Sequence, residues 1–356
     1  MNVLAVDLFS GGGGLTVGLK SAGFTVHSAV EKDLHAAATY RVNHPEVKLI
    51  DKDIRDVSAD DIRPGSDLSL SLIAGCPPCQ GFTSLTSKYK RDDPRNSLIA
   101  EMERLVLAAQ PAAVMMENVP GLVSKGREKF EEFVKRLRNA GYKVDWDILQ
   151  VADYGTPQLR RRLVLLAGKE FRIGLPKATH SRTGSNDTTP WRKVSEVIKD
   201  LPPAETFTSR PLLHDGAIAS EWHRVRRLSS ENLERLRWAK PGGNWMDIPE
   251  HHRPACHRGK YRGFSNVYGR LAWDQTAPTM TGGCTTLSKG RFGHPSELRT
   301  ISVYEAALFQ EFPKDYRIAT PFMDKACDII GNALPCGFAA AMARQVIKAL
   351  GTTGVN

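Results

Sequence analysis

The residues best suited to covalent chemistry lie in one short loop, residues 75–82 (GCPPCQGF). An apolar run at 68–74 precedes the loop and is typical of a buried strand, and two prolines then prevent a strand or helix from continuing. Cys79 is therefore presented just beyond a strand end, which is where ligands and reacting groups gather in open α/β sheets. The loop alone leaves three interpretations open: a nucleophile, a redox pair of Cys76 with Cys79, or small residues in a turn.

A glycine-rich turn, residues 11–14, links an expected strand at 3–9 to an expected helix at 15–23. This is the layout of a nucleotide-type cofactor site, because glycine admits a ligand close to the backbone and the helix N-terminus offers free N–H groups. After a second expected strand, at 25–30, Glu31 follows the turn by about 20 residues, where a carboxylate can accept from two ribose hydroxyls. The contiguous glycines lack the phosphate-binding G-x-G-x-x-G spacing, so a ligand with ribose but no phosphate, such as S-adenosylmethionine, fits better than NAD.

Other polar residues also follow expected strands. Asp53 comes after a short third strand, where it could accept from an adenine amino group or simply belong to a loop. Glu117 directly follows the buried strand expected at 112–116. Strand alternation would place Arg160 and Arg162 on one face of an incipient strand, although adjacent arginines are also typical of a solvated basic patch.

The charge balance favours an anionic partner. The 356 residues include 49 Lys and Arg against 39 Asp and Glu, which gives a net charge of +10 and makes nucleic acid the first candidate, although many soluble proteins are mildly basic. The 6 cysteines are too few and too dispersed for a disulfide scaffold, which favours reduced thiols in a cytosolic setting. Cys256 and its neighbouring histidines match no standard zinc-finger spacing, so we expect no metal. We expect neither a signal peptide nor a membrane span, which needs ~18 apolar residues.

The pattern of elements favours two domains. Expected strands and helices alternate in the first part of the chain, and the strands at 143–151 and 162–168 should be antiparallel neighbours, because their link is too short for a crossover helix. From about residue 176 the composition turns irregular, with basic and aromatic residues interleaved as in nucleic-acid-binding surfaces. An apolar helix expected at 338–350 would return to cover the sheet.

Taken in order, these motifs resemble the DNA (cytosine-5) methyltransferase family over nearly the whole chain. The sequence departs from the family pattern at Cys76, where many members have glycine, in its long glycine run, and at 179–290, which matches only in part. The matching segments are DLFSGxGG at 7–14, Glu31, Asp53, PCQ at 78–80, ENV at 117–119, QxRxR at 158–162, residues 299–311 and GNA at 331–333.

The resemblance implies an α/β fold. A Rossmann-like class I methyltransferase sheet, mostly parallel with one antiparallel strand, would be joined by a smaller irregular target-recognition domain. Residues 1–175 would form the catalytic and S-adenosylmethionine-binding domain, 176–298 the target-recognition domain, and 299–356 a C-terminal segment that returns to the catalytic domain.

The resemblance also implies a reaction. Cys79 would add covalently to carbon 6 of cytosine so that carbon 5 can accept a methyl group from S-adenosyl-L-methionine, leaving S-adenosyl-L-homocysteine. Glu117 would hydrogen-bond ring nitrogen 3 and the exocyclic amine, and Arg162 would contact the base oxygen. Arg160 would orient the glutamate or the cysteine loop. The target cytosine has to leave the duplex to reach these groups.

Further contacts carry over by position from the family. Cofactor contacts would be Phe9, Gly11, Gly13, Leu15, Glu31, Asp53, Ile54, Pro78, Leu98, Asn332 and Ala333. DNA contacts would be Gln80, Ser84, Arg95, Arg270, Thr281 and Arg291, with a basic flap at 87–96 beside the cysteine. The enzyme would act as a monomer on double-stranded DNA in the bacterial cytoplasm. Whether a separate restriction endonuclease accompanies it, or it is an orphan methyltransferase, stays open.

Three other functions stay open. A redox protein using Cys76 and Cys79 would leave Glu117 and the arginines without a use. A non-catalytic DNA-binding protein would have the same composition, but it would need no such set of groups. A tRNA cytosine-5 methyltransferase on the same scaffold is a closer alternative, because a long recognition region argues for duplex DNA only mildly. We expect Cys76→Gly to keep activity and Cys79→Ser to lose it.

Overall fold

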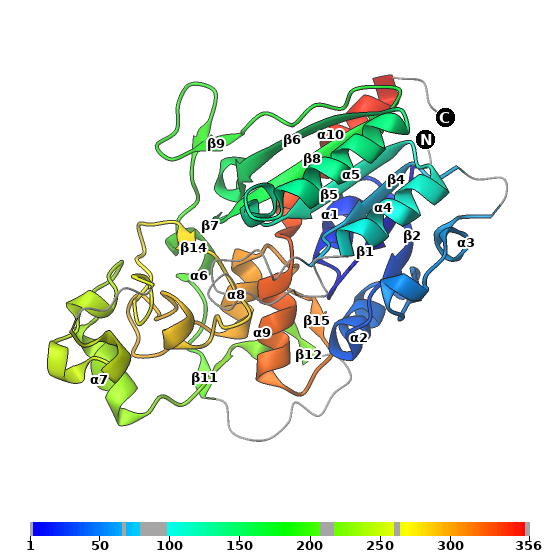
Figure 1. Cartoon of the computed structure of the whole chain (residues 1–356). Helices are drawn as coiled ribbons and strands as arrows, with labels where there is room; N and C mark the ends of the chain where they lie inside the picture. Colours follow the sequence, from blue (N-terminus) through cyan, green and yellow to red (C-terminus); the bar gives the residue numbers. More distant parts are fainter. Residues whose placement is uncertain (1–2, 66–68, 79–97, 207–216, 260–263, 353–356) are drawn as a thin grey trace. The chain divides into compact units, whose positions relative to one another are not determined.

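In a computed structural model of the chain, residues 3–65, 69–78, 98–206, 217–259 and 264–352 are described (Figure 1). The chain forms two compact units. The first comprises residues 1–154, 161–179 and 334–356, and the second comprises 155–160 and 180–333.

The first unit is built on a seven-stranded sheet with the order β3-β2-β1-β4-β5-β8-β6. Neighbouring strands from β3 to β5 are parallel, whereas β8 is antiparallel to both β5 and β6. The expected mostly parallel sheet with one antiparallel strand is therefore confirmed, as is the antiparallel pairing of its last two strands along the chain. The strands are β1 (Leu4–Leu8), β2 (Thr25–Val30), β3 (Lys48–Ile50), β4 (Leu72–Gly75), β5 (Ala113–Asn118), β6 (Tyr142–Gln150) and β8 (Arg161–Lys169).

Helices cover both faces of this sheet because its central strands are apolar on both sides. Every residue of β1, β4 and β5 is buried, as in parallel strands enclosed by two helix layers. Figure 1 shows α4 and α5 on one face and α10 on the other, and two separate buried clusters fill these layers. The helices of the unit are α1 (Gly14–Ala22), α2 (Leu34–Asn43), α3 (Ala59–Ile62), α4 (Leu98–Ala109), α5 (Arg127–Asn139) and α10 (Cys336–Thr352), with short 3₁₀ turns η1 (Ile54–Asp56), η5 (Pro120–Val123) and η6 (Val151–Tyr154).

The return of α10 to the sheet is confirmed, and it depends on a glycine. Helix α1 contacts α10 closely. A Cβ at Gly18 would lie only 2.4 Å from the Cβ of Ala339, so a larger residue could not keep this approach. The contact fixes α1, and with it the glycine turn that precedes the helix.

The second unit is irregular, as its composition predicted. Its strands are β7 (Gln158–Leu159), β9 (His180–Ser181), β10 (Thr189–Pro190), β11 (Glu205–Thr206), β12 (Ala217–Ile218), β13 (Arg224–Val225), β14 (Ala277–Pro278) and β15 (Arg317–Ile318), each paired with one other. Its helices are α6 (Ser195–Ile198), α7 (Ser230–Trp238), α8 (Val303–Phe309) and α9 (Met323–Asn332), with 3₁₀ turns η7 (Ala219–Trp222), η8 (Trp245–Asp247), η9 (Glu250–His252), η10 (Ala255–His257) and η11 (Leu287–Lys289).

The boundaries of the units differ from the expected ones in two places. Residues 155–160 belong to the second unit, because β7 pairs with β14. Residues 299–333 belong there as well, since α8 contacts both α9 and η7. Only the segment from Leu334 onward returns to the first unit. The sequence of a short apolar helix does not show which unit the helix packs against. The boundary at Leu334 could therefore not be predicted from the sequence.

The segment Met323–Thr352 is long and apolar enough, by length and composition alone, to cross a membrane. However, 72% of its apolar window is buried within the protein, and the chain divides it into α9 and α10 before Pro335. Both properties are typical of core helices in globular proteins.

Candidate active site

An ion pair joins the two side chains expected to hold the base. Glu117 lies near the end of β5, and β8 runs beside it with Val164 opposite Glu117. Arg162, near the start of β8, places its Nε 2.5 Å from Glu117 Oε1, and both side chains are largely buried. Such a charge-assisted contact holds a carboxylate in a fixed orientation. The structure therefore brings Glu117 and Arg162 together, as their spacing at neighbouring strand ends suggested.

Asn118 connects this pair to the cysteine loop, and sequence reasoning assigned it no role. Its Nδ2 donates to the carbonyl oxygen of Pro77 at 3.0 Å, while its Oδ1 accepts from the N–H of Val119. One amide side chain thus fixes the start of the loop to the end of β5. The signal was present in the sequence, because Asn118 directly follows the strand-end glutamate. Cys79 itself, with Gln80, Ser84, Arg95 and the flap at 87–96, lies outside the described residues.

Cys76 lies closer to the reacting groups than its expected place in a turn implied. Its thiol hydrogen-bonds to Glu117, consistent with the parallel register that pairs Gly75 of β4 with Met116 of β5. Desolvation, and next the nearby carboxylates of Glu117 and Asp7, raise the pKa of the Cys76 thiol well above its usual range. Cys76 is thus a neutral hydrogen-bond donor to Glu117 and a poor thiolate.

A second site lies at the ends of β1 and β2. The N–H of Gly11 donates to Glu31 Oε2 at 2.8 Å, and the N–H groups of Lys32 and Asp33 donate to Glu31 Oε1. These bonds tie the glycine turn to the expected ribose-binding carboxylate. Gly11 has a φ of +55°, and no atom lies within 4 Å of the position where a Cβ would be. The turn therefore leaves open space beside Glu31, as a bound ligand requires.

Asp53 lies three residues beyond the end of β3 and is the N-cap of η1. Its Oδ1 accepts from the N–H of Arg55 at 3.1 Å, and its Oδ2 accepts from Lys32 Nζ at 3.0 Å. The N–H of Arg55, and then the ammonium of Lys32, hold the pKa of Asp53 below its usual value. Asp53 is thus an ionised acceptor that follows β3, and Glu31 follows the neighbouring strand β2. Such an acceptor suits an adenine amino group.

Asp7 is a buried carboxyl that sequence reasoning mentioned only as part of the first motif. Its Oδ2 accepts from Thr16 Oγ1 at 2.7 Å, and the Thr16 hydroxyl also contacts Tyr40 Oη at 2.8 Å. Within the described part of the chain, Asp7 Oδ1 has no hydrogen-bond partner. Burial raises the pKa of Asp7 to about 7, and Glu31 adds to the shift.

The other expected cofactor residues differ in how much they expose. Phe9 is partly buried with a φ of +61°, an uncommon conformation for a side-chain-bearing residue, and Gly13 caps α1 with a φ of +95°. The side chains of Leu15, Ile54 and Leu98 are buried in the core, so these residues have little besides main chain to offer a ligand. Pro78 is partly exposed, and in the second unit Asn332 is exposed and Ala333 partly so.

Arg160 differs from its neighbour Arg162. It belongs to the second unit, where it is 4% exposed. Its Nη1 donates to the carbonyl oxygens of Met280 at 2.8 Å and Gly331 at 3.1 Å. The alternation that put both arginines on one face fails here, because β7 ends at Leu159 and β8 begins at Arg161.

The expected DNA contacts in the second unit fall into two kinds. Arg270 is 8% exposed, and its guanidinium donates to the carbonyl oxygens of His294, Pro295 and Glu297. We correct its role to a structural one, because basic composition cannot show which arginines are turned inward. Arg291 is partly buried, and desolvation lowers its pKa, whereas Thr281 is exposed.

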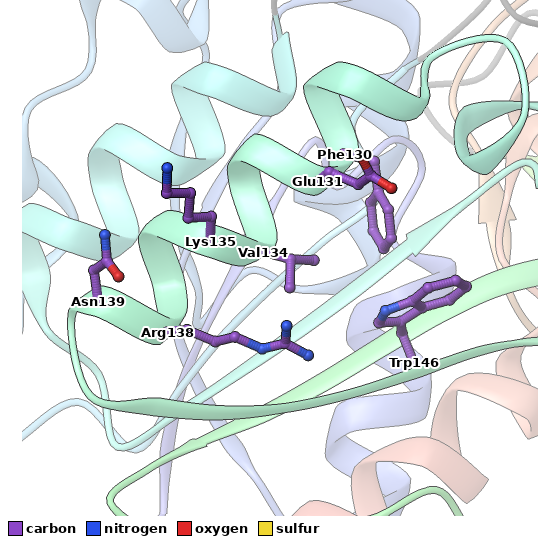
Figure 2. A pocket seen from close by; sticks show the side chains of 7 residues that line it. All are labelled: Phe130, Glu131, Val134, Lys135, Arg138, Asn139 and Trp146. Atoms are coloured by element: carbon purple, nitrogen blue, oxygen red, sulfur yellow. The ribbon is translucent and has the colours of Figure 1, made fainter.

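The described residues hold no group of three or more His, Cys, Asp or Glu arranged to bind a metal ion. A hollow of about 480 Å³ lies between α5 and β6, away from the strand ends that carry these polar residues (Figure 2). Trp146 forms one wall edge-on to Phe130, and Lys135 and Arg138 of α5 flank it (Figure 2). None of the residues predicted from the sequence lines this hollow.

The sheet order, the glycine turn and the carboxylates at the ends of β2 and β3 define a Rossmann-like methyltransferase fold. The family model described as C-5 cytosine-specific DNA methylase matches residues 3–348, and the chain belongs to this family. This confirms the resemblance stated from the motifs.

Similar proteins support the assignment. The Type II methylase M.HgiDII of Herpetosiphon aurantiacus is 35% identical over 97% of this chain and 95% of its own length. The Type II methyltransferase M1.HphI of Haemophilus parahaemolyticus is 32% identical over 98% of this chain and 87% of its own. Among solved structures, a candidate DNA modification methyltransferase encoded within a prophage, from E. coli, superposes with a TM-score of 0.72 at 23% identity, covering 98% of this chain and all of that one.

Proposed function

We propose that this DNA (cytosine-5) methyltransferase transfers a methyl group from S-adenosyl-L-methionine to carbon 5 of a cytosine flipped out of duplex DNA, through a covalent adduct with Cys79. The enzyme class follows from the family. The observation that carries the proposed chemistry is the buried pair of Glu117 and Arg162, joined through Asn118 to the loop that leads to Cys79.

The residues divide the reaction between them. Carbon 5 of cytosine is a poor nucleophile, so the Cys79 thiolate adds to carbon 6 and the ring becomes an enamine that can attack through carbon 5. Glu117 would hydrogen-bond nitrogen 3 and the exocyclic amine of the base, and Arg162, already fixed against Glu117, would contact the base oxygen. After methylation a base removes the proton on carbon 5, the bond from Cys79 to carbon 6 breaks, and the thiolate leaves.

The family and fold imply an S-adenosylmethionine-dependent enzyme, and the strand ends of the first unit fit this cofactor. When bound, it supplies an electrophilic methyl group. Glu31 would accept from the ribose hydroxyls, because its two oxygens are already oriented by three backbone N–H groups. Asp53 would accept from the adenine amino group, and the open space at Gly11 would admit the ligand close to the backbone. Asn332 and Ala333, from the GNA segment at 331–333, would also contact the cofactor.

The substrate and setting are proposed on the same basis. Several relatives are named Type II methylases or methyltransferases, and each matches nearly the full length of this chain. These matches support duplex DNA as the substrate. They also support a restriction-modification or orphan role in the bacterial cytoplasm. The net charge of +10 suits a polyanion. Arg270 is no longer proposed as a DNA contact. Among the described residues, Thr281 and Arg291 remain proposed contacts. Gln80, Ser84 and Arg95 remain proposed from their positions in the family motifs. The enzyme would act on DNA as a monomer, with any restriction endonuclease as a separate protein.

Bisulfite sequencing of DNA from cells that express the protein tests this function. The wild type should produce protected cytosines within one recurring sequence, and Cys79→Ala should produce none. Protection that persists in Cys79→Ala would overturn the covalent mechanism. Purified DNA and tRNA compared as methyl acceptors separate the two substrates, and preferential methylation of tRNA would overturn the choice of DNA.

A further inference from the structure

The second unit contains a buried polar cluster that the reaction described above does not use. We call it the arginine tie, and it consists of Gln158, Arg160, Met280, Gln310 and Gly331. All five residues are described and lie in the second unit. Gln158 and Arg160 come from the segment expected to act on the base, so their contacts bear directly on what that segment does.

The tie connects two backbone segments. Arg160 Nη1 donates to the carbonyl of Met280 at 2.8 Å and to that of Gly331 at 3.1 Å, so one guanidinium spans both. The N–H of Met280 donates to Gln158 Oε1 at 2.8 Å. Two neighbouring side chains thus hold Met280 by both its N–H and its carbonyl group, which fixes its peptide planes more firmly than one bond could.

The second half of the tie fixes the end of α9. Gln158 Nε2 donates to Gln310 Oε1 at 2.7 Å, and Gln310 Nε2 in turn donates to the carbonyls of Ile330 at 2.6 Å and Ala333 at 3.0 Å. The last carbonyls of a helix have no partner within the helix. Side chains that donate to these carbonyls therefore fix the path of the chain after the helix. Here the chain goes on through Asn332 and Ala333.

A glycine makes the close approach possible. A Cβ on Gly331 would lie 2.0 Å from the carbonyl carbon of Thr281, which is backbone and cannot rotate away. Thr279 adds an outer bond, since its Oγ1 donates to the carbonyl of Leu159 at 2.7 Å beside the β7–β14 pairing. The backbone at Gly331 is therefore packed directly against the backbone at Thr281, next to the bonds that Arg160 makes to the carbonyls of Met280 and Gly331.

We propose that Gln158 and Arg160 are positioning residues: they hold residues 279–281 against the end of α9 and thereby set Asn332 and Ala333 for cofactor binding and Thr281 for DNA. This inference rests on the proposed function, in which Asn332 and Ala333 contact the cofactor. It replaces the expectation that Arg160 orients the glutamate or the cysteine loop. Loss of the tie should weaken cofactor binding without removing any group that touches the cofactor.

The test is the affinity of the purified full-length protein for S-adenosyl-L-homocysteine, measured by isothermal titration calorimetry, alongside its melting temperature. Arg160→Lys keeps the charge but cannot reach both carbonyls in the planar geometry of a guanidinium, so the Kd should rise about tenfold or more, as expected for one or two lost charged hydrogen bonds. Thr279→Val, a milder change at the edge of the tie, should raise the Kd about twofold to fivefold.

The matched control is Arg270→Lys. Arg270 is another buried arginine of the same unit that also donates to backbone carbonyls, so its replacement should lower the melting temperature comparably. Its Kd for S-adenosyl-L-homocysteine should stay at the wild-type value, because its partners lie at residues 294–297. A general loss of stability would affect both variants alike, whereas positioning affects Arg160→Lys alone.

Gly331→Ala breaks the same contact by an independent route and should also raise the Kd. Equal Kd values for Arg160→Lys and Arg270→Lys, or wild-type Kd values for both Arg160→Lys and Thr279→Val, would overturn the inference while leaving the proposed function intact. If Arg160→Lys does not fold, the Thr279→Val result decides. A wild-type protein that binds no S-adenosyl-L-homocysteine would instead contradict the proposed function, and the inference would fall with it.

Discussion

Arg160 and Arg162 stand two residues apart in the sequence, yet they serve different regions of the molecule. Arg162 meets a side chain, Glu117, at a strand end of the first unit. Arg160 meets backbone carbonyls in the second unit. In the proposed function the first region presents side chains to the substrate, whereas the second region uses side chains to hold backbone in place. A change in the first should therefore cost chemistry, and a change in the second should cost position or stability.

The largest effect is expected for Glu117→Ala. The variant removes the group proposed to hold the base, so the methylation rate should fall by about 10²–10⁴-fold, the usual contribution of one positioned acid–base group. Steady-state kinetics with duplex DNA measure it. Glu131→Ala is the control, because Glu131 is exposed and pairs with Arg127 on the surface of α5. A rate within tenfold of wild type would remove Glu117 from the reaction.

The second region should respond in stability. Arg299 forms a doubly hydrogen-bonded pair with fully buried Glu305, so Arg299→Met leaves an unpaired buried charge and should lower the free energy of unfolding by about 3–5 kcal/mol. Arg237→Met breaks an exposed pair with Glu234 in the same unit and should cost less than about 1 kcal/mol. Urea unfolding measures both. Equal losses would show that burial of the pair does not matter.

Asp7 should make the stability of the first unit depend on pH. The pKa of Asp7 in the folded state, about 7, lies above the ordinary value for Asp. Between about pH 4 and pH 7 the folded state therefore keeps a proton on Asp7, whereas the unfolded state has already released it. The free energy of unfolding should therefore fall as pH rises through this window, by a few kcal/mol at most. Asp7→Asn has no proton to lose, so it should gain stability relative to wild type between pH 5 and pH 8. Parallel pH dependence of the two unfolding curves would contradict this.

The smallest effect is expected for Cys76→Gly. Its thiol donates one weak hydrogen bond to Glu117, so we expect most activity to remain, with a loss of about fivefold or less. Alkylation by iodoacetamide gives a second measurement, made in the Cys79→Ser variant. Cys76 should be labelled slowly at pH 8, because the raised pKa of Cys76 keeps its side chain a thiol. Adding Glu117→Gln should make the labelling of Cys76 faster. A loss of activity in Cys76→Gly as large as in Cys79→Ser would mean that both thiols take part in the reaction.

The two regions also differ in how much of their structure could be predicted from the sequence. In the first unit, apolar runs end where polar residues begin, so the strand ends and the group of Glu31, Asp53 and Glu117 could be expected from local pattern alone. The antiparallel strand followed from a short link. The contacts that Asn118 and Cys76 make to the neighbouring strand were not predicted, because spacing along the chain does not show which residues of different strands meet.

In the second unit, prediction failed where an arginine turns inward. Arg160 and Arg270 bond to carbonyls of residues far away in the sequence, and nothing in their immediate neighbours distinguishes them from exposed arginines. Strand alternation could not separate Arg160 from Arg162, because the strand breaks between them. Composition predicted an irregular basic region correctly, but composition does not tell which cations face solvent.

The covalent bond between Cys79 and cytosine is the central step of the proposed mechanism. Duplex DNA of mixed sequence in which 5-fluorocytosine replaces cytosine tests it, because fluorine on carbon 5 cannot leave as a proton does and the adduct persists. With S-adenosylmethionine present, the wild type should form a complex that survives denaturation, and peptide mass spectrometry should place the nucleotide on Cys79. No complex with an enzyme that methylates ordinary duplex DNA, or an adduct on Cys76, would contradict the account.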